Sequence, residues 1–195
     1  MKQFAATLLG LVTAVLVVPG NAIAQDQPQT AQLVEGNAQL DGSVTTKSAK
    51  QGDVVTANLT STVKTSQGVE LPHGTKLIGH VDQVVAANGK GASKLVLTFD
   101  KAQLKNGKEV AIKATIAGVA PSDGTVDIPS TVASDATFDQ LPGGFGGVSL
   151  HSAVKEDDSG TLTGDHHDVH LSRGTQMLIA LAPQAESASA QGGAQ

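Results

Sequence analysis

Residues 52–119 alternate between apolar and polar side chains, and this alternation constrains the fold more than any other feature of the chain. The period of two is clear in residues 55–59, and it recurs in residues 94–100 and 110–116. Successive side chains of a β-strand point to opposite faces, so this period is typical of strands buried on one side. The sequence therefore predicts a series of half-buried strands.

Turn-forming residues separate these predicted strands. Asn88-Gly89 and Asn106-Gly107 are dipeptides typical of turns between strands. Gly79 interrupts a strand pattern, which indicates a bend or a close approach of two strands. Several short strands at this spacing favour an all-β fold, either a small β-barrel or a barrel-like sandwich. The side chains expected to share its interior are Leu77, Val81, Leu97, Phe99, Ile112 and Ile116.

The N-terminus has the features of a secretory signal peptide. Lys2 precedes an apolar run over residues 4–18, and small residues follow up to Ala24. This apolar run is shorter than the roughly 20 residues that a membrane-spanning helix needs. We expect residues 1–24 to be removed, so that the mature chain starts at Gln25 without a membrane span. The protein is then exported to the periplasm or the extracellular space.

The remaining 171 residues suit one domain with tails. Residues 25–32 are polar and are predicted to form a disordered leader. Residues 184–195 are rich in Ala, Ser, Gln and Gly and are predicted to form a disordered tail. The single barrel domain is expected over residues 33–183, and no internal repeat recurs at a fixed period.

Composition excludes several classes of function. The chain has no cysteine, so disulfides and thiolate metal sites play no part in its stability. The mature chain keeps 12 basic residues against 18 acidic ones, a formal charge of −6, and only three Phe residues as aromatics. Nucleic-acid surfaces need cations and often stacking rings, so we expect no nucleic-acid partner.

Residues 132–165 show the weakest strand pattern and are expected to form a Gly-rich loop insertion. This segment holds two of the three mature aromatic residues, Phe138 and Phe145. Two alternatives are open for these rings. They form the anchors of a partner-binding surface, or they plug one end of the barrel.

The segment from Val69 to Val81, VELPHGTKLIGHV, resembles the β-barrel domain of TrbI-type proteins, the scaffold subunits of conjugation and type IV secretion systems. The shared pattern is apolar-Pro-x-Gly-Ser/Thr-x-Leu-apolar-Gly. The hairpin at residues 104–110 and the Gly-Thr segment at residues 169–178 resemble two further parts of that barrel. The resemblance covers residues 50–120 and, more loosely, residues 165–182. It implies a barrel fold and a place in the bacterial cell envelope.

The chain also departs from the TrbI-type pattern. Its signal is cleavable, whereas the scaffold subunits keep an inner-membrane helix. The region comparable to their pore-forming helical insertion, residues 132–150, is Gly-rich and weakly apolar. A secreted, free-standing form of the barrel domain is therefore expected.

One cluster contains residues of the types that bind metal ions. His166, Asp168 and His170 would share one face if residues 166–170 formed a strand. Two imidazoles and a carboxylate are suitable ligands for zinc or another divalent ion. The alternative is a solvated polar turn that leads into the last strand.

These observations predict a structural or binding module of the cell envelope that is not an enzyme and carries no cofactor. Its expected partners are envelope proteins or further copies of the chain. Two alternatives are open. One is a divalent-metal-binding protein or hydrolase that uses His166, Asp168 and His170. The other is a carrier that holds a small apolar ligand in the mouth of the barrel.

Overall fold

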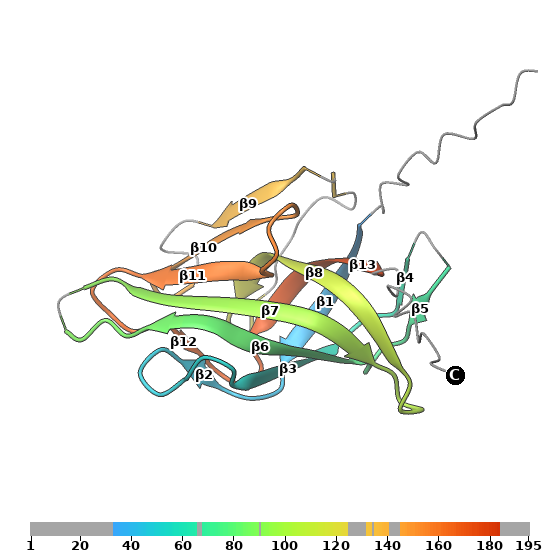
Figure 1. The fold of residues 1–195 in the computed structure, drawn as a ribbon, viewed down its shortest axis with the longest axis horizontal. Coiled ribbons are helices and arrows are strands. Elements are labelled where there is room, and N and C mark those ends of the chain that lie inside the picture. Colours follow the sequence, from blue (N-terminus) through green and yellow to red (C-terminus); the bar gives the residue numbers. More distant parts are fainter. Residues whose placement is uncertain are drawn as a thin grey trace, which may run out of the picture.

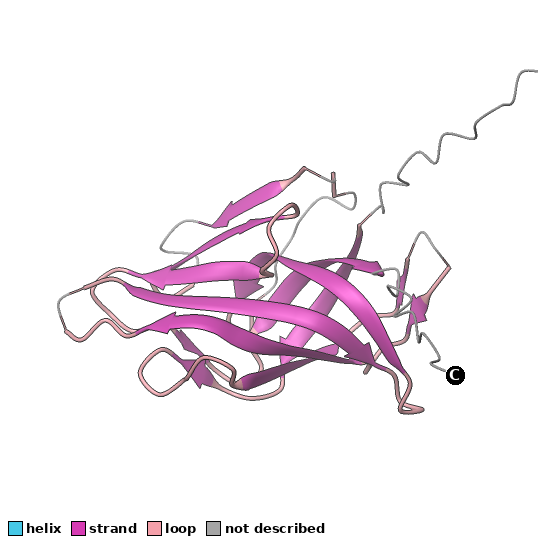
Figure 2. Ribbon diagram, in the orientation of Figure 1, coloured by secondary structure: helices cyan, strands magenta, loops and turns pink. Residues whose placement is uncertain are grey.

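The computed structural model describes residues 33–65, 68–89, 91–124, 132–133, 135–140 and 145–183. Within these ranges the protein is all-β and contains no helix (Figure 2). The first strands are β1 (Val34–Leu40), β2 (Val44–Thr45), β3 (Val54–Leu59), β4 (Val63–Lys64), β5 (Glu70–Leu71), β6 (Lys76–Val85) and β7 (Ser93–Gln103). The later strands are β8 (Glu109–Ala120), β9 (Thr137–Gln140), β10 (Val148–Ala153), β11 (Gly160–Gly164), β12 (His170–Leu171) and β13 (Gln176–Pro183).

Six of these strands form a closed antiparallel β-barrel. Their order around the barrel is β6-β3-β1-β13-β8-β7, and the pairing of β6 with β7 closes the circle (Figure 1). The predicted small β-barrel is therefore confirmed. The predicted signal peptide, leader and tail lie outside the described residues. The described part of the chain has no helix of the length and apolarity needed to cross a bilayer.

The barrel interior is filled by aliphatic side chains and one aromatic ring. All six side chains predicted to share the interior belong to one cluster, and each is at most 2% exposed. Burying a large aliphatic side chain contributes roughly 1.5–3 kcal/mol, so this cluster is the main source of the stability of the fold. The strand phase deduced from the alternating pattern is confirmed.

Gly79 permits the close strand approach that the sequence predicted. A Cβ atom at this position would lie 2.0 Å from the carbonyl oxygen of Thr98 on β7. The register between β6 and β7 also shifts between Ile78 and Gly79. Any side chain here would push the two strands apart, so β6 can bend against β7 only with glycine.

A tight turn connects β5 to β6 and is hydrogen-bonded to the end of β3. The amide of Thr75 donates to the carbonyl of Pro72 at 3.0 Å, and Gly74 takes a φ of 79° within the turn. The amide of Gly74 then donates to the carbonyl of Leu59 at 2.7 Å. In return, the amide of Leu59 donates to the carbonyl of Thr75 at 2.9 Å. We call this arrangement the first hook.

A second hook repeats this arrangement at the end of β1. The amide of Thr175 donates to the carbonyl of Ser172 at 3.1 Å, and Gly174 has a φ of 88°. The amide of Gly174 donates to the carbonyl of Leu40 at 2.9 Å, and the amide of Leu40 donates to the carbonyl of Thr175 at 2.9 Å. The two hooks therefore share the same turn and the same hydrogen bonds.

Each hook carries a small two-stranded sheet. Val63 of β4 pairs with Leu71 of β5 in the first, and Val44 of β2 pairs with Leu171 of β12 in the second. Figure 1 shows these two sheets toward opposite ends of the long axis. Four of the six barrel strands thus form two matching pairs, β1 with β13 and β3 with β6.

The segment predicted as a loop insertion contributes three strands. β9, β10 and β11 all lie within residues 132–165, and β11 pairs with β7. The sheet therefore continues beyond the barrel in the order β7-β11-β10-β9. The pattern was weak because small or polar residues, such as Ser152, Gly160 and Gly164, occupy buried positions. Residues 125–131, 134 and 141–144 of this region lie outside the described residues.

Candidate functional site

The barrel wall opens between β7 and β8, and Ser159 bridges the opening. β7 and β8 pair only between residues 101–103 and 109–111, because β11 pairs with the earlier part of β7. The Ser159 amide donates to the carbonyl of Leu97 at 2.8 Å, and its hydroxyl oxygen accepts from the amide of Phe99 at 2.8 Å. Its carbonyl accepts from the amide of Ile116 at 2.7 Å.

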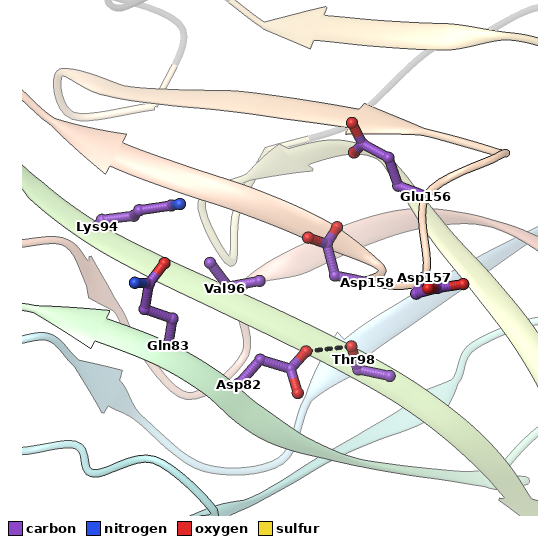
Figure 3. Close-up of a pocket in the computed structure, with 8 residues that line it drawn as sticks. All are labelled: Asp82, Gln83, Lys94, Val96, Thr98, Glu156, Asp157 and Asp158. Carbon is purple, nitrogen blue, oxygen red and sulfur yellow. Dashed lines mark hydrogen bonds between the residues drawn. The ribbon is translucent and has the colours of Figure 1, made fainter.

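Because Ser159 is fixed in this way, the loop before it has a defined place on the barrel. This loop, residues 154–159, joins β10 to β11. A cleft of about 620 Å³ lies on the outer surface between the loop, β6 and β7 (Figure 3). Its lining residues are Asp82, Gln83, Lys94, Val96, Thr98, Glu156, Asp157 and Asp158. We call it the acidic cleft.

A β-bulge turns two neighbouring residues of β6 toward the acidic cleft. Val81 pairs with Leu97 and Gln83 pairs with Val96, so Asp82 is an extra residue without an opposite partner. In a regular strand, Asp82 and Gln83 would point to opposite faces. The bulge removes this alternation, and both side chains line the outer cleft.

Each carboxylate oxygen of Asp82 has a partner of its own on a neighbouring residue. One carboxylate oxygen accepts a hydrogen bond from the hydroxyl of Thr98, drawn as a dashed line in Figure 3. The other lies 2.8 Å from Nε2 of His80. His80 and Asp82 are two residues apart on β6, and both are partly exposed.

The charge of the acidic cleft is strongly negative. Lys94 is the one cation among its lining residues, against four carboxylates. Burial raises the pKa of Asp158, and the negative charges of Glu156 and Asp82 raise this pKa further. One carboxylate oxygen of Asp158 is buried and has no hydrogen-bond partner. A positively charged group in the cleft would relieve this repulsion.

The predicted metal-ligand residues lie on a bend and not on a continuous strand. Residues 165–167 form the bend, and His166 takes a positive φ of 62°. Only His170 lies in a strand, the two-residue β12, and both His166 and His170 are exposed. Residues 166–170 therefore do not form the strand on which the three side chains would share one face.

Asp168 makes hydrogen bonds that hold neighbouring loops together. One of its carboxylate oxygens accepts hydrogen bonds from the Thr46 hydroxyl and from the Ala87 amide, each at 2.9 Å. These two bonds lower the pKa of Asp168, the bond from Ala87 most. Asp168 thus ties the β11–β12 loop to the turn after β2 and to the β6–β7 connection. Across the described ranges, no three His, Asp or Glu side chains are grouped to hold a metal ion.

The two aromatic residues of the predicted insertion differ in their surroundings. Phe145 is 8% exposed and packs into the main core, next to β10. Phe145 is thus a core side chain and not an exposed one. Phe138 lies in β9 and is half-buried.

Sequence analysis did not identify the acidic cleft. The run Glu156-Asp157-Asp158 was visible as an acidic, turn-prone segment, but nothing local indicates which strand it faces. Its proximity to Asp82 depends on the pairing of β11 with β7, which is a long-range contact. A run of three acids directly before a buried Ser159 is the one local signal that could have drawn attention to this loop.

Comparison of the chain with models of protein families, with curated proteins and with solved structures gave no significant match.

Proposed function

We propose that the protein is an exported, non-enzymatic β-barrel module of the bacterial cell envelope that binds a partner protein. The observation that carries this proposal is the filled barrel: the interior is occupied by the core, so contacts with a partner fall on the outer surface. The segment over residues 69–81, which resembles the TrbI-type barrel, supports a setting related to type IV secretion. The signal peptide expected at residues 1–24 supports export.

The acidic cleft is the part of the outer surface with the most defined chemistry. Its carboxylates surround the apolar side chain of Val96, with Asp158 carrying a buried oxygen that has no partner. A lysine or arginine side chain of a partner matches this combination, because its aliphatic stem packs on Val96 while its charge meets Asp158. The partner is therefore a protein with an exposed basic residue.

Two features disfavour the alternatives. The metal-hydrolase alternative needs His166, Asp168 and His170 on one face, whereas residues 165–167 form a bend and one oxygen of Asp168 already accepts hydrogen bonds from Thr46 and Ala87. The carrier alternative places an apolar ligand in the mouth of the barrel, and the interior behind the mouth is filled by buried side chains such as Phe99 and Leu97.

Export and binding can be tested separately. The intact mass of the protein recovered from the periplasm should correspond to a chain that begins at Gln25. A chain that retains residues 1–24 would contradict export by a cleaved signal.

Binding is tested by photo-cross-linking in intact cells. A photoreactive residue at exposed Asp157 should give an adduct with a defined envelope protein, and the adduct should disappear in the Asp82→Asn, Asp158→Asn double variant. The matched control places the photoreactive residue at exposed Asn106, on the β7–β8 hairpin away from the cleft. Equal adducts from both positions, or an adduct that survives the double variant, would contradict the cleft as the binding surface.

A further inference from the structure

His151 lies between two carboxylates that belong to different elements. It is on β10, directly opposite Asp139 of β9. Its Nδ1 atom is 2.6 Å from a carboxylate oxygen of Asp139, and its Nε2 atom is 3.6 Å from a carboxylate oxygen of Glu156. On the other side of β10, the residue opposite His151 is the uncharged Thr161 of β11.

This geometry suits only the protonated form of the imidazole. A neutral ring has one N–H donor, so one of its two nitrogens must present a lone pair. Both nitrogens of His151 face carboxylates, which are acceptors and carry negative charge. The neutral ring would therefore place a lone pair against Asp139 or Glu156, whereas the imidazolium is attracted to both.

We propose that His151 is a proton-operated latch between strand β9 and the β10–β11 loop. In the protonated state, the ring bridges Asp139 on the strand and Glu156 on the loop. Loss of the proton leaves one hydrogen bond and one repulsive contact, so this side-chain link between the two elements is lost. The backbone bond from the Val154 amide of the loop to the carbonyl of Ala136, directly before β9, remains.

The latch acts at a point of the fold that has few other connections. β9 is the last strand of the sheet, and its backbone pairs with β10 over four residues. β9 has a further connection through the side chain of Gln140. Its Oε1 atom accepts from the backbone amide of Val119 at 3.0 Å, and its Nε2 atom donates to the carbonyl of Val119 at 2.9 Å. Release of His151 therefore loosens β9 and removes a restraint on Glu156 of the acidic cleft.

The direction of the pH effect follows from the partners of His151. The hydrogen bond to Asp139 raises the pKa most. Burial is the next largest cause and lowers it, and the charges of Asp139 and Glu156 raise it further, so that the pKa of His151 is raised on balance. A group whose pKa is raised on folding stabilises the folded form fully below its unfolded pKa, near 6.5. The stabilisation is lost as the pH rises through the raised value. Low pH thus closes the latch, and a pH above the raised pKa of His151 opens it.

The first measurement is an NMR titration of the His151 ring in the folded and in the urea-unfolded protein. The pKa should be higher in the folded form, and both Asp139→Asn and Glu156→Gln should lower it. Asp157→Asn is the matched control, since it removes a neighbouring charge that does not contact the ring. A folded pKa equal to or below the unfolded value would overturn the proposal.

The second measurement is hydrogen exchange of the β9 and β10 amides, expressed as protection relative to the unfolded chain at each pH. Protection should fall severalfold between pH 5.5 and 8.5 in the wild type, and it should be independent of pH in His151→Gln. His73→Gln is the control, because His73 is an exposed turn residue with no carboxylate partner among the described contacts. If the wild type and His151→Gln respond alike to pH, His151 is not the latch. The outcome does not depend on the identity of the partner protein.

Discussion

Ser159 shows how one buried side chain can fix the loop that lines the acidic cleft. Its hydroxyl oxygen is the acceptor for the amide of Phe99, and the residue is 1% exposed. Ser159→Ala leaves this amide buried without a partner, which typically costs about 1–3 kcal/mol. Urea unfolding should show this loss of stability. The control is Ser172→Ala, which changes an exposed side chain and should unfold at the same urea concentration as the wild type. An equal loss of stability in both variants would contradict the role of the Ser159 hydroxyl.

Asp168 makes a prediction that separates its structural role from metal binding. Asp168→Ala removes the acceptor for Thr46 and Ala87 and should lower the unfolding temperature at pH 7. The folded pKa of Asp168 is lowered, so its contribution is present above the ordinary value near 3.8 and is lost as the pH falls through the folded pKa. The difference between wild type and variant should therefore narrow in acid.

The controls for Asp168 are its exposed neighbours. His166→Ala and His170→Ala should change the unfolding temperature little, because neither side chain is buried. If all three variants lost the same stability, and if a chelator reproduced that loss in the wild type, the residues would act together as metal ligands.

At the scale of the elements, the sequence predicted the strands with alternating apolar residues well and the strands with small buried residues poorly. β7 and β8 span 11 and 12 residues, and their apolar positions show the period of two clearly. In β10 and β11, by contrast, buried positions include Ser152, Gly160 and Gly164, which carry no hydrophobic signal. Their burial results from packing against β7 and β8, and packing of this kind is not encoded in any local pattern. The acidic cleft depends on the same contacts and was missed for the same reason.

The strand phase of β8 can be tested with two adjacent residues. Ile112 is 2% exposed in the core, whereas Lys113 is next to it on the opposite face. Ile112→Ala should cost about 2–5 kcal/mol, as large-to-small substitutions in a core do. Lys113→Ala should cost less than about 0.5 kcal/mol, as is usual for surface substitutions. Equal shifts in urea unfolding would indicate that the register is displaced by one residue.

At the scale of the whole molecule, two strand pairs with matching hooks recur in the barrel, and this match was hidden in the sequence. Leu40 and Leu59, the residues to which the two hooks are hydrogen-bonded, are 19 residues apart. Leu71 and Leu171, which precede the hooks, are 100 residues apart. No single offset aligns both parts, so a search for a fixed period finds no repeat. The match becomes visible only when β1 pairs with β13 and β3 pairs with β6.

If the two hooks contribute equally to stability, the same substitution in each should lower the free energy of unfolding by a similar amount. Gly74 and Gly174 have φ values of 79° and 88°, a conformation that costs other residues roughly 1–2 kcal/mol. Gly74→Ala and Gly174→Ala should therefore each lower the free energy of unfolding by about that amount. Gly42→Ala is the matched control, since Gly42 has no positive φ and an added Cβ would meet nothing within 4 Å.

The double variant Gly74→Ala, Gly174→Ala tests whether the two strand pairs are independent. Each hook has its own turn and is hydrogen-bonded to a different strand. The two losses in free energy of unfolding should therefore add. Urea unfolding followed by circular dichroism measures both the single and the double effects. A combined loss well above the sum would mean that one hook supports the other, and the barrel would then behave as one cooperative ring and not as two independent strand pairs.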